Sequence, residues 1–116
     1  ITDSTTFVIL NTLNIETPGF YYIVWEGVVT LETGTGKVTI RLSDNEAVEL
    51  DHSLRILAPI GDLSLTTSAI VYITSDKGNY IVNLEWLTEK STVYTIRKNS
   101  LRAIAIGTRA VTDTKK

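Results

Sequence analysis

The chain has 116 residues, 43% of them apolar and 21% charged, which is ordinary for one globular domain and too apolar for intrinsic disorder. Its 11 basic and 13 acidic residues lie in both halves, so no basic face is available for the phosphates of nucleic acid. Cysteine is absent, which excludes disulfides, thiolate metal sites and a cysteine nucleophile. We expect a single domain over residues 1–116.

Membrane insertion is not expected. The longest uninterrupted apolar run, Phe20 to Trp25, is far shorter than the roughly 20 residues that a membrane-spanning helix needs. The chain starts at Ile1 and contains no methionine, so we expect a trimmed, processed or partly represented translation product. A secreted origin is compatible with this.

Apolar and polar residues alternate along most of the chain, which is typical of strands with one buried face. In chain order, Thr5–Leu13 and Phe20–Thr33 are the first two candidate strands, and Pro18-Gly19 separates them. The second is so long that Gly27 is expected to mark a bulge or a crossing between sheets.

Three hairpins are predicted in the rest of the chain, each from two alternating segments that flank polar turn residues. They pair residues 38–42 with 48–50, 63–73 with 80–86, and 92–97 with 101–106. The total of about eight strands, spaced roughly 8–12 residues apart, predicts an all-β fold, a two-sheet antiparallel sandwich.

The two ends, residues 1–6 and 107–116, are rich in Thr, Asp and Lys and show little periodicity. They are interpreted as flexible termini or as arms that reach a neighbouring subunit by adding a strand to its sheet edge.

Catalytic chemistry finds little support. His52 is the only histidine, and it follows Glu49 and Asp51, so a metal or acid/base role competes with a structural role in a turn, which alternation favours. No serine lies in a Gly-x-Ser-x-Gly motif. Gly34 to Lys37 lacks the full phosphate-loop spacing and is interpreted as a hairpin turn. We expect no enzyme and no cofactor.

Two polar turns could supply oxygen ligands to calcium, namely Asp44-Asn45-Glu46 and Asp76 to Asn79. Tight turns use the same residue types, and the full spacing of a calcium loop is missing, so turns are favoured over metal sites.

Aromatic and aliphatic side chains occur on both faces of several predicted strands, although one domain has a single core between its sheets. The aromatic cluster at Phe20 to Trp25 is expected mainly to fill the core, with a subunit interface or a carbohydrate site as alternatives. The outward residues form the candidate interface, which consists of Tyr22, Trp25, Ile70, Tyr72, Ile81, Leu87, Ile104 and Ile106.

The C-terminal half carries one resemblance. The segments 63–73, 77–86, 92–96 and 101–106 include Gly78-Asn79-Tyr80-Ile-Val-Asn-Leu-Glu-Trp86, a strand after a turn, and a final apolar strand. This order resembles the closing strands of compact jelly-roll domains, namely the tumour-necrosis-factor-like and complement-type heads and the viral fibre and capsid-decorating proteins. The resemblance covers about 45 residues and implies a jelly-roll-like sandwich, a homotrimer, and a role in binding or in a shell.

The sequence therefore favours two functions. The first is a self-assembling structural subunit of a virus or phage particle (capsid, decoration or fibre protein) or of an extracellular filament, with other copies or shell proteins as partners. The second is an extracellular carbohydrate-binding module that uses exposed Tyr and Trp side chains, with or without calcium. The expected location is the virion or the extracellular space.

Overall fold

The structure is a computed structural model of the chain, and it describes residues 6–58, 61–74, 79–89 and 91–107. These ranges contain seven β-strands and no helix. The strands are β1 (Val8–Ile15), β2 (Gly19–Thr33), β3 (Val38–Ser43), β4 (Arg55–Leu57), β5 (Asp62–Ile73), β6 (Tyr80–Thr88) and β7 (Val93–Gly107).

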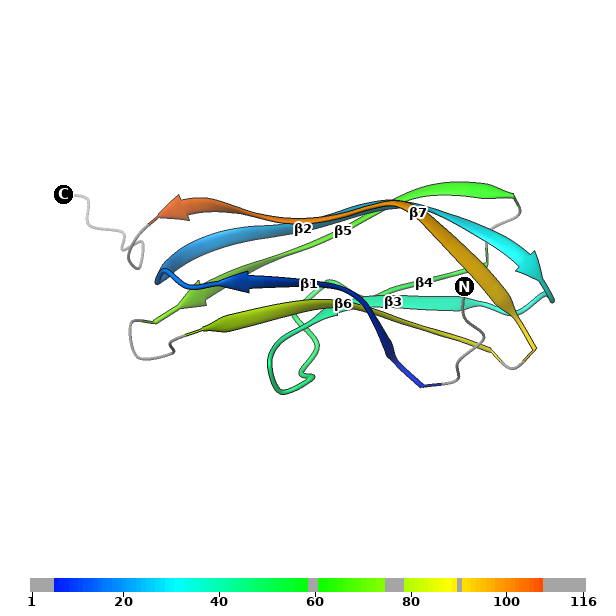
Figure 1. Cartoon of the computed structure of the whole chain (residues 1–116), viewed down its shortest axis with the longest axis horizontal. Helices are drawn as coiled ribbons and strands as arrows, with labels where there is room; N and C mark the ends of the chain where they lie inside the picture. Colours follow the sequence, from blue (N-terminus) through cyan, green and yellow to red (C-terminus); the bar gives the residue numbers. More distant parts are fainter. Residues whose placement is uncertain (1–5, 59–60, 75–78, 90, 108–116) are drawn as a thin grey trace.

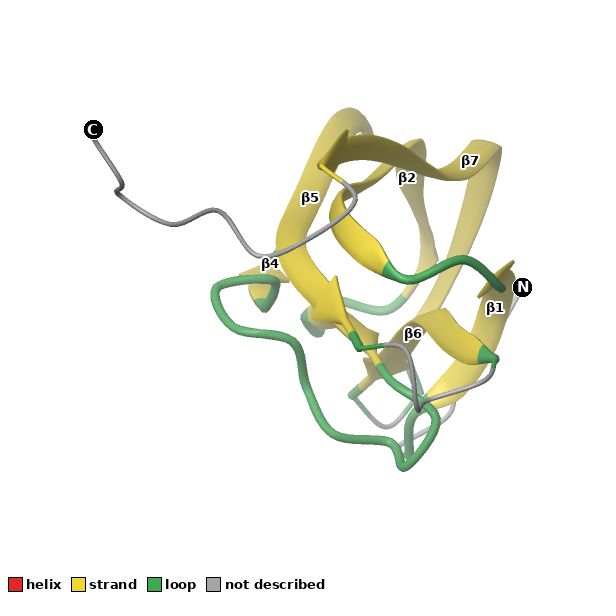
Figure 2. Ribbon diagram, turned by 90° about the vertical axis from the view of Figure 1, so that its left-hand side faces the viewer, coloured by secondary structure: helices red, strands yellow, loops and turns green. Residues whose placement is uncertain are grey.

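The strands form two antiparallel sheets, one ordered β1-β6-β3-β4 and the other β5-β2-β7. The two sheets lie as separate layers in Figure 1, and Figure 2 shows them end on, with β5, β2 and β7 together in one layer. The predicted two-sheet antiparallel sandwich is confirmed, with seven strands in the described residues where about eight were expected.

The pairing is nested, because β1 pairs with β6, β2 with β5, and β3 with β4. A long hairpin gives this pattern when it is wrapped across two sheets, as in jelly-roll-like sandwiches. Two further pairs complete the sheets. β7 pairs with β2 in the three-stranded sheet, and β6 pairs with β3 in the four-stranded sheet.

The core lies between the layers and contains the inward-facing side chains of both sheets. Trp25, Trp86 and Tyr94 are fully buried there, and the rings of Trp86 and Tyr94 meet edge to face at 6.4 Å. Alternation along each strand explains this packing, since every second residue of β2, β5 and β6 faces inward.

Two of the predicted hairpins are wrong, although their strands exist. The segments 63–73 and 80–86 lie in β5 and β6, which belong to different sheets and therefore do not pair with each other. The segments 92–97 and 101–106 are one continuous strand, β7. The fifteen residues of β2 provide a partner along all of β7, and Lys98 and Asn99 form a bulge in that strand where a turn was predicted.

The remaining turn predictions hold in part. Around Asp44 the chain does reverse, but residues 48–50 form only an isolated bridge between Ser43 and Glu49, beside the hydrogen bond from Leu50 N to Leu42 O. The Gly34 to Lys37 segment joins β2 and β3, which lie in different sheets, so it is a crossing and not the predicted hairpin turn.

Phenol titration provides a test of the packing at the crossing between β2 and β3. Tyr94 donates a hydrogen bond to Gly36 O at 2.7 Å, and burial, followed by the negative charge of Glu89, raises the pKa of the Tyr94 phenol above 10.0. The folded state therefore retains this proton longer than the unfolded chain, so the stabilisation is complete below about pH 10 and is lost as pH rises through the folded pKa. Urea unfolding between about pH 9 and 11 should show a steeper loss of stability for the native chain than for Tyr94→Phe. Equal slopes would contradict this expectation.

Candidate interaction face

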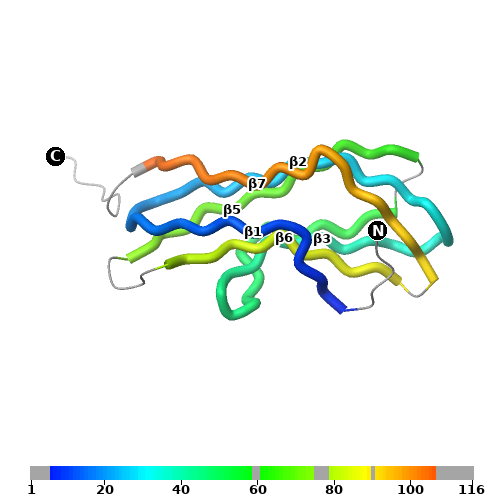
Figure 3. The backbone as a smooth tube through the Cα atoms, in the orientation of Figure 1, coloured from blue at the N-terminus to red at the C-terminus, as the bar shows by residue number. Residues whose placement is uncertain are grey.

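The outer face of the β5-β2-β7 sheet carries apolar side chains at one end. Tyr22 lies between Ile70 and Ile104 in the strand register, and Phe20 lies opposite Tyr72, with 4.5 Å between the two ring centroids. Ile70 is 65% exposed. The end of the sheet in question is the one where β2 begins and β7 ends (Figure 3). We call this set the apolar patch; it consists of Phe20, Tyr22, Ile70, Tyr72, Ile104 and Ile106.

Five residues of the predicted interface meet in the apolar patch, namely Tyr22, Ile70, Tyr72, Ile104 and Ile106. They come from three strands that are distant in sequence, and the sheet order brings them side by side. Alternation alone predicts which residues point outward, but only the strand order decides that they share one end of one sheet.

Trp25 is a correction to the predicted interface, because its side chain is fully buried. It shares its inward direction with Ile23, and its indole N–H donates to Asn99 Oδ1 at 2.7 Å. Ile81 and Leu87 do face outward, but they are half-buried and lie on β6 in the other sheet. They are therefore not part of the apolar patch.

A groove of about 300 Å³ lies beside the apolar patch, between Tyr22 and Ile70 on one side and Asp51 and His52 on the other. His52 is exposed and has a φ of 66° in the loop before β4. Its backbone carbonyl accepts a hydrogen bond from Arg55. Within the described ranges no group of three or more His, Cys, Asp or Glu side chains is placed to hold a metal ion.

The polar end of the same face is largely neutralised within the chain. Arg102 pairs with Glu26 at 2.8 Å, and Arg97 pairs with Asp62. Thr30 also donates to Asp62 Oδ1 at 2.6 Å. The outer face is therefore apolar at one end, and the other end carries two ion pairs, Arg102–Glu26 and Arg97–Asp62.

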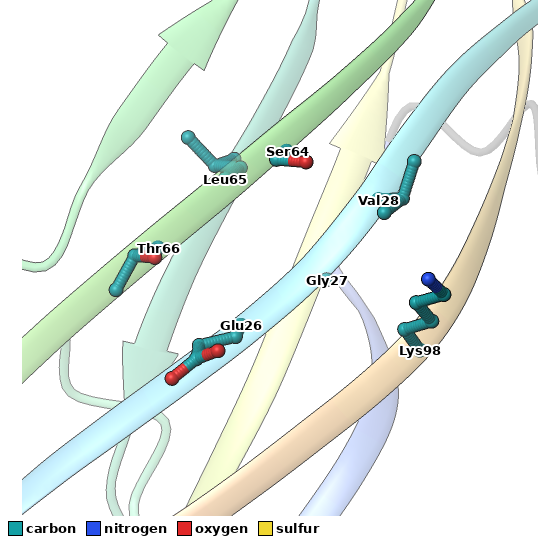
Figure 4. Close-up of a pocket in the computed structure, with 7 residues that line it drawn as sticks. All are labelled: Glu26, Gly27, Val28, Ser64, Leu65, Thr66 and Lys98. Carbon is teal, nitrogen blue, oxygen red and sulfur yellow. The ribbon is translucent and has the colours of Figure 1, made fainter.

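A shallow polar hollow of about 250 Å³ lies where β2 passes the bulge of β7. Figure 4 shows Ser64 and Thr66 on β5 and Lys98 on β7, on either side of β2, with Gly27 between them. Sequence reasoning missed this hollow because Lys98 to Ser100 read as a turn. The one feature of the sequence that indicates a continuous β7 is the length of β2, because a strand of fifteen residues pairs fully only with an equally long neighbour.

Two side-chain oxygens of the first candidate calcium turn accept hydrogen bonds within the chain. Asp44 Oδ1 accepts hydrogen bonds from the backbone N–H groups of Glu46 at 2.9 Å and Val48 at 3.0 Å. Asn45 Oδ1 accepts one from the N–H of Ile81 at 2.8 Å. These contacts support the turn interpretation. Of the second candidate turn, residues 76–78 lie outside the described residues, as do most of the two predicted arms.

The outer face of the other sheet differs in character. Arg41 Nε donates to Glu85 Oε1 at 2.8 Å, and the Phe7 ring covers the guanidinium at 3.8 Å. Both charges of this cluster have partners within the chain, because Arg41 pairs with Glu85 and its guanidinium also packs on the Phe7 ring. Sequence reasoning did not find it, since the three residues are far apart in the chain.

Among the described residues, no helix is long and apolar enough to cross a membrane. Comparison of the chain with models of protein families, with curated proteins and with solved structures found no match.

Proposed function

We propose that the protein is a non-enzymatic structural subunit that self-associates through the apolar patch, as a homotrimer. The observation that carries the proposal is the grouping of six large side chains from β2, β5 and β7 at one end of an outer sheet face. An outer face that only meets water does not need such a cluster.

The size of the apolar patch suits the centre of a subunit interface. Five of its side chains are 36% to 65% exposed, which corresponds to roughly 500 Å² of accessible apolar surface. A stable interface buries about 800 Å² on each partner, with an apolar core and a polar rim. The neighbouring groove and the polar end of the sheet supply such a rim.

A second copy is the partner that this face fits best. The charged residues nearest the apolar patch, Arg102 and Glu26, are paired with each other, so the patch itself has no excess charge beside it to select an acidic or basic partner. A neutral rim around an apolar centre can meet its own copy without repulsion. The resemblance of the C-terminal strands to jelly-roll domains is the reason for proposing a trimer.

The proposed setting is a virus or phage particle, as a capsid, decoration or fibre subunit, or otherwise an extracellular assembly. The resemblance of residues 63–106 to the closing strands of viral fibre and capsid-decorating proteins supports it. Carbohydrate binding through exposed Trp side chains is less favoured, because Trp25 and Trp86 are both fully buried.

A pair of matched variants tests the role of the apolar patch. Ile70→Lys places a charge in the patch, where burying it against a second copy costs several kcal/mol, so we expect association to weaken by more than about tenfold. Ile56→Lys is the control, since Ile56 is 59% exposed, close to the 65% of Ile70, but lies on β4 in the other sheet. Multi-angle light scattering after gel filtration measures the mass of each variant.

The expected result is a trimer for the native chain and for Ile56→Lys, and a monomer for Ile70→Lys at the same concentration. Both substituted side chains are exposed in one chain, so both variants should remain folded, and only Ile70→Lys should lose the stabilisation that assembly gives. An Ile70→Lys variant that assembles like the native chain would refute the proposed interface.

A further inference from the structure

The polar hollow at the bulge of β7 has a chemistry of its own. It is lined by Glu26, Gly27 and Val28 of β2, by Ser64, Leu65 and Thr66 of β5, and by Lys98. It lies toward the polar end of the outer face and shares no residue with the apolar patch.

Unpaired polar groups are concentrated in this hollow. Within the described part of the chain, the side chains of Ser64, Thr66 and Lys98 make no hydrogen bond or ion pair. The charged neighbours on the same face behave differently, since Arg97 and Arg102 each have a carboxylate partner. The hollow therefore offers one free ammonium from β7 and two free hydroxyls from β5, on either side of β2 (Figure 4).

The bulge places the ammonium at this point. Lys98 has a φ of 55°, in the left-handed region that lysine rarely adopts and that costs on the order of 1 kcal/mol or more. The register shift between Glu26 and Val28 sets this extra residue against β2. Lys98 thus lines the hollow from the β7 side of β2 (Figure 4).

Glu26 completes the lining as an acceptor. Its Oε2 accepts a hydrogen bond from Arg102 at 2.8 Å, so its negative charge is balanced. Its Oε1 accepts no hydrogen bond from any described residue, and it can take a hydroxyl hydrogen from a ligand. The net charge that the hollow presents is that of Lys98, which favours an anion.

We infer that the hollow binds a small polyhydroxylated carboxylate, of the size and kind of an acidic monosaccharide. The carboxylate of the ligand pairs with Lys98, and its hydroxyl groups exchange hydrogen bonds with Ser64, Thr66 and Glu26. A volume of about 250 Å³ holds a single sugar ring. The hollow is shallow and has no aromatic stacking surface, so a Kd on the order of 1 to 10 mM is expected.

Titration of the full chain, followed by the chemical shifts of its backbone amides, tests this inference with three probes. Glucuronate carries both the carboxylate and the hydroxyls, glucose only the hydroxyls, and sulfate only the charge. We expect saturable shifts with glucuronate at Gly27, Val28, Ser64, Thr66 and Lys98, and binding at least about tenfold weaker for the other two probes.

Two lysine variants make the result specific. Lys98→Gln keeps the length of the side chain but removes its charge, and it should weaken glucuronate binding by about tenfold or more. Lys37→Gln is the control, because Lys37 is also exposed but lies in the crossing between β2 and β3, outside the hollow. It should bind glucuronate like the native chain.

Three outcomes would overturn the inference: no shifts at the hollow with glucuronate, sulfate binding as tight as glucuronate binding, or equal losses in both lysine variants. The proposed self-association is measured separately, by light scattering of the same samples. A failure at the hollow is thereby distinguished from a failure at the apolar patch.

Discussion

Replacing Asn99 with alanine is expected to lower the free energy of unfolding by about 3 kcal/mol. The Oδ1 of Asn99 accepts hydrogen bonds from Trp25 Nε1 at 2.7 Å and from Asn11 Nδ2 at 3.0 Å, and its Nδ2 donates to Leu10 O at 3.2 Å. This one side chain on β7 thus joins β2 of its own sheet to β1 of the other sheet.

The large effect follows mainly from the burial of Trp25, whose indole N–H Asn99 satisfies. In Asn99→Ala the indole N–H of Trp25, on a fully buried side chain, loses its acceptor, and the Asn11 amide and the Leu10 carbonyl each lose a partner. Each unsatisfied buried group costs about 1–3 kcal/mol.

Urea unfolding of Asn99→Ala beside Asn14→Ala measures this effect. Asn14 is an exposed asparagine of β1 whose side chain makes no hydrogen bond in the described part of the chain, so its replacement should change stability by less than about 0.5 kcal/mol. If the two variants were equally stable, Asn99 would not join the sheets as described.

Gly27→Ala is expected to destabilise the fold by a similar amount, about 2–3 kcal/mol. A Cβ at position 27 would lie 2.4 Å from Cζ2 and 2.9 Å from Cη2 of the Trp25 ring. The ring is fully buried and its N–H is held by Asn99, so it cannot move aside without breaking that hydrogen bond. Position 27 is therefore restricted to glycine, because the Trp25 ring occupies the space that a Cβ would need.

A double-mutant cycle isolates this clash. Trp25→Phe removes the ring atoms that a Cβ at position 27 would meet, so Gly27→Ala should cost clearly less in the Trp25→Phe background than in the native chain. Unfolding free energies of the four proteins give the coupling. A cost that is the same in both backgrounds would show that contact with Trp25 does not explain the requirement for glycine.

Alternation predicted the strands well because it depends only on which residues face the core. The inward side of β2 carries Ile23 and Trp25, and that of β6 carries Leu84 and Trp86, as the period of two requires. The outward direction of Ile70, Tyr72, Ile104 and Ile106 was predicted in the same way and is confirmed by their exposure.

Strand pairing was less predictable, because it depends on contacts between segments that are distant in the chain. The polar residues Lys98 to Ser100 look like a hairpin turn locally, yet pairing with the long β2 keeps β7 continuous and absorbs Lys98 and Asn99 as a bulge. Trp25 was assigned to the candidate interface for a related reason. An aromatic run contains both inward and outward residues, and only the register of β2 with its two neighbours separates them.

The mass of the unmodified chain in solution tests the central claim, self-association, most directly. Light scattering after gel filtration over a range of loading concentrations should give about 38 kDa, three times the 12.8 kDa of one chain. The mass should fall toward that of a single chain only on strong dilution. A mass of 12.8 kDa at every concentration would contradict the account, because the apolar patch would then have no partner in a second copy.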